Sequence, residues 1–306
     1  MTDQAGKSRR LRRRVLWASL AVVVVAAGAI LGISGYAASS LTKFERVPLG
    51  SNPADFGLEY VDISFPSRDG LTLRGWWLEG GDVNPIIVVL HGSGGNRADP
   101  PERMLGIARD LVSYGYNVLM FDMRGHGESE GEHISAGLYE KNDLLSAIDY
   151  IRQRGAENKI GVLGFSMGAA VCLMAAPESD EIDAVVADSA YADIVSIIES
   201  EFAERSSLPR FFIPIILFMT RTIYDIDFTA IKPVEAVKEI SVPVFIIHGG
   251  QDEMIPIQHA YRLKEASQNL SSKLWIAPEA QHANSYLVRP TEYKEQVLSF
   301  FDEALD

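Results

Sequence analysis

The first pattern along the chain is an uninterrupted apolar stretch near its N-terminus. Val15 to Ile33 reads VLWASLAVVVVAAGAILGI, and Ser19 is its only plainly polar residue. As a helix of about 19 residues rising ~1.5 Å each, it would be ~28 Å long, close to the ~30 Å of a bilayer core. The pattern predicts a transmembrane helix at residues 15–36.

The charges around this stretch predict its orientation. Six basic residues crowd the first fourteen positions, and only two follow the stretch closely. By the positive-inside rule, residues 1–14 form a cytoplasmic tail and the chain after Gly35 lies outside the cytoplasm. We therefore expect a single-pass protein of the cell membrane. A cleaved signal peptide ending near residues 37–39, giving a secreted protein, is the alternative, although its apolar part is usually only ~7–15 residues long.

Beyond a linker at residues 37–57, short apolar runs alternate with segments of helical period. The first two runs, at 60–65 and 71–78, flank a Ser-Arg-Asp-Gly turn typical of a hairpin. Later runs such as PIIVVL at 85–90 are continuously apolar, as in strands buried on both faces of a parallel sheet. Further strands are expected at 116–121, 160–165, 184–187, 242–247 and 273–277, and helices at 101–114, 137–154, 257–267 and 291–305. This alternation predicts an α/β fold with a mostly parallel sheet covered by helices on both faces.

Residues 193–229 interrupt the alternation. They contain the apolar run Phe211 to Met219, which is too short and too interrupted by proline to span a membrane. We expect a helical cap inserted between two core strands of a domain that covers residues 58–306. The apolar run either serves a lipid or long-acyl substrate reached near the membrane face, or simply packs the cap onto the core.

Composition narrows the function classes. The net charge is −13 although the N-terminus is basic, so the remainder is more acidic still, which argues against a nucleic-acid partner. Cys172 is the only cysteine, which excludes an intrachain disulfide and a thiolate metal cluster. The sequence leaves the oligomeric state open.

The segment IGVLGFSMGAAVC at residues 160–172 carries the clearest chemistry. Ser166 lies between Gly164 and Gly168 in a G-x-S-x-G motif, between an expected buried strand and an expected helix. In this context the motif is typical of a nucleophile elbow, a tight turn that exposes the serine beside a helix N-terminus. A serine that merely caps the helix is the alternative.

A nucleophilic serine needs a base and an acid that orients the base. His282 follows the last expected strand, where a base can reach over the sheet, and we expect it to be that base. Asp252 follows a late strand between the serine and the histidine, and is the expected acid, with Asp188 after the preceding strand as its rival. His259, on an expected helix, is predicted to be a surface residue.

The oxyanion of an acyl-transfer reaction needs two backbone N–H donors. We expect one from Met167, the residue after the serine. We expect the other from Ser93, in the loop His91-Gly-Ser-Gly-Gly-Asn96, whose glycines let the backbone approach a substrate closely. Such a loop could also bind phosphate, but the sequence contains no G-x-x-x-x-G-K-[ST] motif.

These motifs, in this order, resemble the α/β-hydrolase superfamily over about residues 60–305. The resemblance is nearest to membrane-anchored serine aminopeptidase-like and ABHD-type hydrolases. It rests on His91-Gly92, DMRGHGES at 122–129, GFSMG at 164–168, HGGQD at 248–252 and His282. It implies an eight-stranded, mostly parallel sheet with an antiparallel first hairpin, and hydrolysis of an ester, thioester or amide without metal or cofactor. The substrate does not carry over, because the anchor and the cap lie outside the shared pattern.

The sequence thus predicts a membrane-anchored serine hydrolase that forms an acyl-enzyme on a small-molecule or lipid substrate. A catalytically silent member of the fold, used as a binding or scaffold protein at the membrane, is the alternative. Such members typically lack one of the three catalytic residues, and all three are present here. A cofactor-free lyase or haloperoxidase would share the same three residues.

Overall fold

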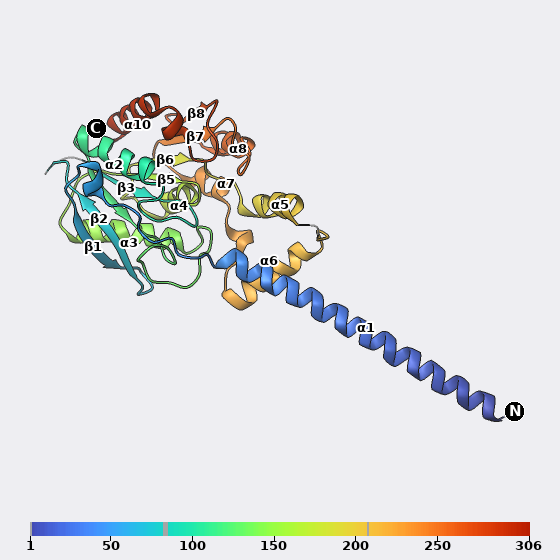
Figure 1. Cartoon of the computed structure of the whole chain (residues 1–306). Helices are drawn as coiled ribbons and strands as arrows, with labels where there is room; N and C mark the ends of the chain where they lie inside the picture. Colours follow the sequence, from blue (N-terminus) through green and yellow to red (C-terminus); the bar gives the residue numbers. More distant parts are fainter. Residues whose placement is uncertain (1, 82–84, 207) are drawn as a thin grey trace.

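Eight strands pair into one sheet in the order β1-β2-β4-β3-β5-β6-β7-β8. The structure, a computed structural model, describes residues 2–81, 85–206 and 208–306 (Figure 1). The strands are β1 (Val61–Pro66), β2 (Thr72–Leu78), β3 (Ile86–Leu90), β4 (Asn117–Phe121), β5 (Ile160–Phe165), β6 (Ala184–Asp188), β7 (Val244–Gly249) and β8 (Lys273–Ala277). Strand β2 is antiparallel to both β1 and β4, and every other pair is parallel. The predicted mostly parallel sheet with its antiparallel first hairpin is confirmed.

Helices cover both faces of this sheet because its inner strands are apolar on both sides. In β3, Val88 and Leu90 face one core and Ile87 and Val89 face the other, as the period of two in a strand requires. Helices α3 (Glu140–Gln153), α4 (Met167–Ala175) and α8 (Gln258–Ala266) pack on the first face, and α2 (Pro101–Tyr114) and α10 (Pro290–Leu305) on the second. Short helices complete the body: η1 (Pro53–Phe56), η2 (Ala176–Glu178), α7 (Pro233–Ala236), η4 (Val237–Glu239) and α9 (Ser285–Val288).

The expected cap is present between β6 and β7. It consists of α5 (Ile194–Arg205), α6 (Phe212–Tyr224) and η3 (Phe228–Ala230). Ile197 of α5 shares a buried cluster with Ala170 and Met174 of α4, the helix that begins beside Ser166. This contact fixes the base of the cap to the core near the elbow.

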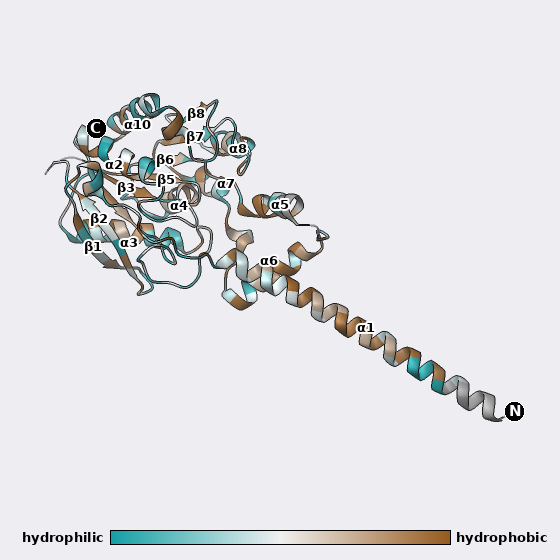
Figure 2. Cartoon of the chain, in the orientation of Figure 1, coloured by the Kyte–Doolittle hydropathy of each residue, from teal (hydrophilic) through white to brown (hydrophobic). Residues whose placement is uncertain are grey.

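Helix α1 (Thr2–Thr42) projects from the body and contains the apolar stretch (Figure 1). Residues 10–42 are long and apolar enough to cross a membrane, and Figure 2 shows much of α1 in the brown of hydrophobic residues. Large side chains such as Val22 and Val25 are exposed. The helix runs beyond the expected end at residue 36. It does so because its last turns pack against the body, with Ala38 and Thr42 fully buried.

Candidate active site

Ser166 stands in a turn that the backbone tolerates only with glycine on both sides. It joins β5 to α4 with φ of 53° and ψ of −115°, a strained conformation for a residue with a side chain. A Cβ on Gly164 would lie 2.3 Å from the carbonyl oxygen of Gly168, and one on Gly168 would lie 2.5 Å from that of His91. The Ser166 N–H donates to the Asp188 carbonyl at 2.8 Å, which anchors the turn to β6.

The parallel strands bring the three predicted residues together at one edge of the sheet. Asp252 follows β7 and His282 follows β8, so both lie in loops at the carboxyl ends of the strands, as Ser166 does. The end of β7 packs closely against the loop after β8, since a Cβ on Gly249 would lie 2.4 Å from the Ala280 carbonyl oxygen. We call the loops that follow β3, β4, β5, β6, β7 and β8 the carboxyl edge.

A chain of hydrogen bonds links the three side chains. His282 Nδ1 donates to Asp252 Oδ2 at 2.8 Å, and Ser166 Oγ donates to His282 Nε2 at 2.8 Å. The Asp252 carboxylate is fully buried and its Oδ1 accepts the N–H groups of Met254 and Ile255 at 3.0 and 2.8 Å. The carboxylate therefore orients the imidazole so that Nε2 can accept the serine proton.

Asp188, the rival acid, occupies a different position. It is fully buried at the end of β6, and burial raises the pKa of its carboxyl group. Its Oδ1 accepts the Ser189 hydroxyl at 3.0 Å, and Ser189 Oγ accepts the N–H of Ala283 at 3.0 Å. Asp188 thus reaches the loop of His282 through Ser189, whereas the imidazole itself contacts Asp252.

The glycine-rich loop after β3 passes directly beside the serine. A Cβ on Gly92 would lie 3.3 Å from that of Ser166 and 4.0 Å from its Oγ. Among the residues that the structure describes, neither the Ser93 nor the Met167 N–H donates a hydrogen bond. Ser93 is exposed, and Met167 opens α4, where the helix leaves its first N–H groups free. The geometry leaves both N–H groups available to an anionic oxygen.

Two buried histidines, whose contacts the sequence did not predict, hold this loop. His91 Nδ1 donates to Gly92 O at 2.7 Å and its Nε2 accepts the Met123 N–H at 3.1 Å. His126 Nδ1 donates to Arg124 O at 2.8 Å and its Nε2 accepts the Gly94 N–H at 3.3 Å. Burial lowers the pKa of both imidazoles, which favours the neutral forms that these contacts require.

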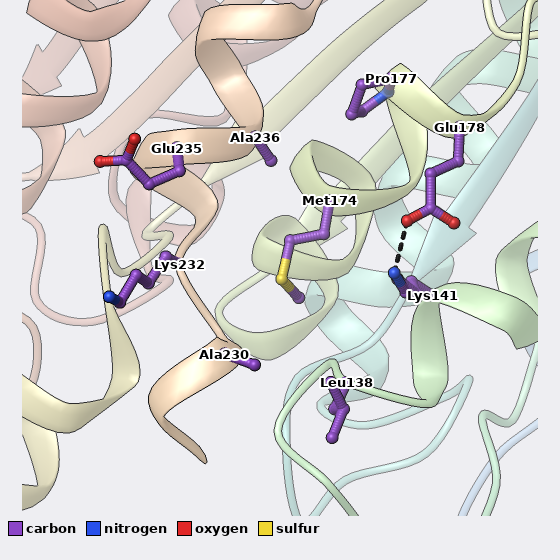
Figure 3. A pocket seen from close by; sticks show the side chains of 9 residues that line it. All are labelled: Leu138, Lys141, Met174, Pro177, Glu178, Ala230, Lys232, Glu235 and Ala236. Carbon is purple, nitrogen blue, oxygen red and sulfur yellow. Dashed lines mark hydrogen bonds and ion pairs between the residues drawn. The ribbon is translucent and has the colours of Figure 1, made fainter. Parts of the chain in front are cut away.

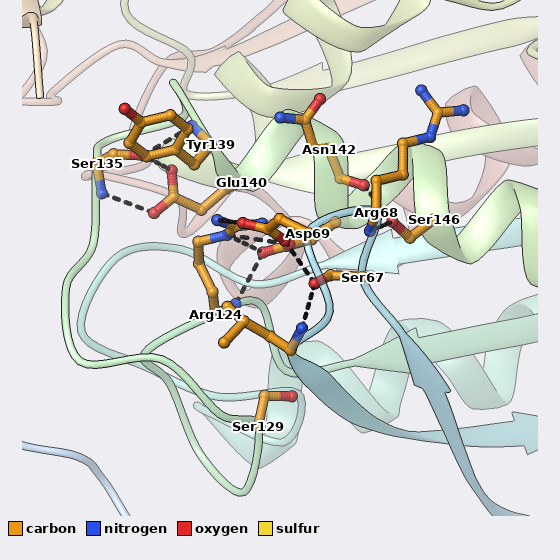
Figure 4. Close-up of polar contacts among 12 residues, drawn as sticks. Ser67, Arg68, Asp69, Arg124, Ser129, Ser135, Tyr139, Glu140, Asn142 and Ser146 are labelled. Atoms are coloured by element: carbon orange, nitrogen blue, oxygen red, sulfur yellow. Dashed lines mark hydrogen bonds and ion pairs between the residues drawn. The ribbon is translucent and has the colours of Figure 1, made fainter. Parts of the chain in front are cut away.

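Buried charges hold the loop between β4 and α3 that carries His126. The guanidinium of Arg124 binds Asp143 at 2.7 Å. It also binds Asp69 at 2.8 Å (Figure 4). The Glu140 carboxylate, seen beside Ser135 in the same figure, accepts the Ser135 N–H at 2.7 Å. It also accepts the Gly137 N–H at 2.7 Å. The polar DMRGHGES motif is therefore a structural support for the carboxyl edge.

A separate pocket of about 340 Å³ lies between α3, α4 and the end of the cap (Figure 3). None of the three predicted catalytic residues lines it; its walls are Leu138, Lys141, Met174, Pro177, Glu178, Ala230, Lys232, Glu235 and Ala236. Lys141 and Glu178 form an ion pair at its rim. Within the described residues, no group of three His, Cys, Asp or Glu side chains could hold a metal ion.

The comparisons with known proteins agree with this architecture. The family model described as "alpha/beta hydrolase fold" matches residues 85–212. The protein YfhR of Salmonella typhi is 31% identical over 272 residues, which are 84% of this chain and 85% of YfhR. The chain belongs to the α/β-hydrolase superfamily.

Other relatives have names that state an activity. The esterase Pf2001 of Pyrococcus furiosus superposes with a TM-score of 0.72 at 27% identity, over 86% of this chain and all of the esterase. The lysophosphatidylserine lipase ABHD12 of Danio rerio is 26% identical, over 88% of this chain and 76% of the lipase. Family and fold together make this chain a hydrolase.

Proposed function

We propose that this chain is a serine hydrolase that cleaves an ester, thioester or amide through an acyl-enzyme. The observation that carries the proposal is the chain of hydrogen bonds from Ser166 through His282 to Asp252, each at 2.8 Å. Its position at an elbow, beside two available backbone N–H groups, matches the requirements of nucleophilic catalysis.

The proposed reaction has two halves. In the first, His282 Nε2 takes the Ser166 proton, Oγ bonds to the substrate carbonyl carbon, and the N–H groups of Ser93 and Met167 bind the oxyanion. His282 then protonates the leaving group as its bond to carbon breaks. In the second half, His282 deprotonates a water that attacks the acyl-enzyme, and returns the proton to Ser166 as the acid leaves. Asp252 stabilises the charged imidazole in both halves.

The proposed location is the cell membrane, with α1 as a retained anchor, the basic N-terminus in the cytoplasm and the hydrolase domain at residues 58–306 outside it. The length and apolar composition of α1 support an anchor. The burial of Ala38 and Thr42 supports retention, because cleavage near residue 38 would cut a helix that packs on the domain. Mass spectrometry of the mature protein tests this: a terminus near residue 40 would exclude the anchor.

The proposed substrates are lipids or other long-acyl esters. The apolar cap and the likeness to the zebrafish lysophosphatidylserine lipase support this choice. A series of p-nitrophenyl esters from acetyl to palmitoyl tests it, with kcat/KM expected to rise with chain length. A preference for acetyl esters would contradict the lipid proposal and leave the serine mechanism intact.

A fluorophosphonate probe tests the nucleophile directly. Labelling of the full chain should be abolished in Ser166→Ala, with the melting temperature of the variant measured to show that it folds. Ser93→Ala is the matched control: it removes a neighbouring hydroxyl but keeps the backbone N–H, so labelling should persist. Labelling that survives in Ser166→Ala, or a folded wild type that does not label, would contradict the proposal.

A further inference from the structure

Cap helix α6 meets α1 at the level where α1 would leave a bilayer. A buried cluster of Ala38, Phe212 and Ile216 joins the two helices, and Ile30 of α1 packs against it. Ile30 lies inside the apolar stretch that ends at Ile33. The cap therefore contacts the predicted membrane segment itself.

A second contact between α1 and α6 lies at the same height along α1. A Cβ on Gly35 would lie 3.3 Å from Met219 Cε, so α6 approaches α1 closely at this glycine. Gly35 is two residues beyond Ile33, which is ~3 Å along a helix. Figure 1 shows α6 beside the part of α1 that meets the body. With α1 in a membrane, this level is the boundary between acyl chains and headgroups.

The outer face of α6 is apolar. Phe218 is 65% exposed, and Phe211, at the start of the helix, is 51% exposed. The two positions are seven residues apart and so share one face of a helix, with exposed Pro214 between them. Aromatic side chains gathered on an exposed surface mark a site that another apolar phase covers.

The charge of this segment differs from that of the chain as a whole. Residues 208–224 contain no Asp or Glu, and their only charges are Arg210 and Arg221, in a chain of net charge −13. Arg221 contacts Asp227 at 3.5 Å, yet its side chain remains 69% exposed. Exposed aromatics with flanking arginines and no acidic residue within the helix itself are typical of helices that bind anionic membrane surfaces.

We propose that α6 is an interfacial helix whose outer face, Phe211, Pro214 and Phe218, inserts into the same bilayer that holds α1, with Arg210 and Arg221 at anionic headgroups. The occupant is the lipid surface because α6 packs on the apolar part of α1, the predicted membrane segment, much of which is brown in Figure 2. The inference rests on the proposed anchor and not on catalysis. Docking would fix the cap, and with it the carboxyl edge, against the membrane.

The test uses environment-sensitive labels on single introduced cysteines in the full chain. Cys172, the only native cysteine, is fully buried and burial raises its pKa, so it does not compete for the label. Phe218→Cys reports on α6, Val23→Cys on the centre of α1, and Leu270→Cys, at a fully exposed turn between α8 and β8, on the far side of the domain. Each carries a nitrobenzoxadiazole group, in vesicles of phosphatidylcholine and phosphatidylglycerol with brominated acyl chains.

Bromines near the headgroups should quench the label at position 218, bromines near the chain ends should quench the label at 23, and neither should quench the label at 270. Replacing both Arg210 and Arg221 by Gln should weaken quenching at 218 in anionic vesicles and leave it unchanged at 23. Quenching at 23 but not at 218 would overturn the inference and keep the anchor. No quenching at 23 would overturn both. A shielded label at 218 that bromolipids do not quench, and that self-quenches with protein density, would assign the face to a second copy of the chain.

Discussion

The carboxyl edge and the cap are held in place by different forces. At the carboxyl edge, buried polar side chains bind backbone groups, as when His126 accepts the Gly94 N–H and Ser189 accepts that of Ala283. The cap packs on the rest of the chain through apolar clusters, such as the one that joins Phe212 and Ile216 to Ala38, alongside polar contacts such as that of Asp225 with Tyr139. Directional bonds fix positions closely, whereas apolar contacts tolerate changes of shape and composition.

This difference separates two tasks in one chain. A reacting serine and its base must stay within about half an ångström of their working geometry, which hydrogen-bonded loops provide. A surface that meets a membrane or an acyl chain needs only area and the right polarity. Substitutions at the carboxyl edge should therefore have sharp, position-specific effects, and substitutions in the cap and linker should have graded ones.

The largest effect should separate the two acids of the carboxyl edge. Asp252→Asn removes the carboxylate that orients His282 and should lower kcat about 10⁴-fold, since the amide favours the wrong imidazole tautomer. Asp188→Asn keeps an oxygen that can accept the Ser189 hydroxyl and should lower kcat less than about tenfold. Steady-state kinetics on a soluble ester, with melting temperatures for both variants, makes the comparison. Equal losses would show that the loop contact through Ser189 matters as much as the imidazole contact.

The next effect is on stability. Gly164→Ala would place a Cβ 2.3 Å from backbone atoms of Gly168, which cannot move without opening the elbow. The free energy of unfolding should fall by about 3 kcal/mol or more, or the variant should fail to fold. Gly50→Ala is the matched control in the linker, where an added Cβ would have no described atom within 4 Å other than those of its chain neighbours. It should change the free energy of unfolding by less than about 0.5 kcal/mol. Chemical denaturation in detergent measures both; a stable, active Gly164→Ala would contradict the proposed role of the turn.

Acid should destabilise the domain through its buried histidines. Burial lowers the pKa of His259 to about 4, so below its ordinary pKa of about 6.5 the unfolded chain binds a proton that the folded chain does not. The free energy of unfolding should therefore fall as pH decreases from about 6.5 to about 4, by up to ~1.4 kcal/mol per pH unit for this residue. His259→Asn, whose amide oxygen can still accept the Ala192 N–H at the position of Nδ1, should reduce that slope. Identical slopes in the variant and the wild type, from denaturation curves at several pH values, would contradict this assignment.

The sequence predicted what depends on local pattern. The continuous apolar strands, the glycine-flanked Ser166 and the order of the motifs were enough to predict the sheet and the residues that meet at its carboxyl edge. Contacts between distant segments had no such signature. His259 was predicted at the surface and is buried with its Nδ1 on the Ala192 N–H, a correction that only the packing of α8 against the start of the cap explains. Likewise, no periodicity indicated that α1 continues to Thr42, because its last turns are helical against α6.

Another contact that the sequence could not predict joins the linker to the carboxyl edge. Arg46, four residues after α1 ends, donates to the carbonyls of Gly127 at 3.0 Å, Ser129 at 2.5 Å and Gly131 at 2.6 Å. Those carbonyls belong to the loop whose His126 holds Gly94. The guanidinium thus connects the anchor side of the molecule to the support of the expected oxyanion loop.

Removing this clamp should give the smallest effect. Arg46→Ala removes these hydrogen bonds and should lower the free energy of unfolding by about 1–2 kcal/mol. The loss is small because water can replace the exposed guanidinium at the same carbonyls. The substitution should also lower kcat a few-fold with KM little changed, since the loop that presents Ser93 becomes less constrained. Arg46→Lys keeps the charge but not the forked set of guanidinium donors. Its kcat and its free energy of unfolding should lie between those of the wild type and Arg46→Ala. Lys43→Ala, an exposed cation nearer the helix, should change neither quantity. A change in KM alone in Arg46→Ala would show that the linker acts on substrate access. The hydrogen bonds that position the carboxyl edge would then be those within the domain's own loops, without a contribution from Arg46.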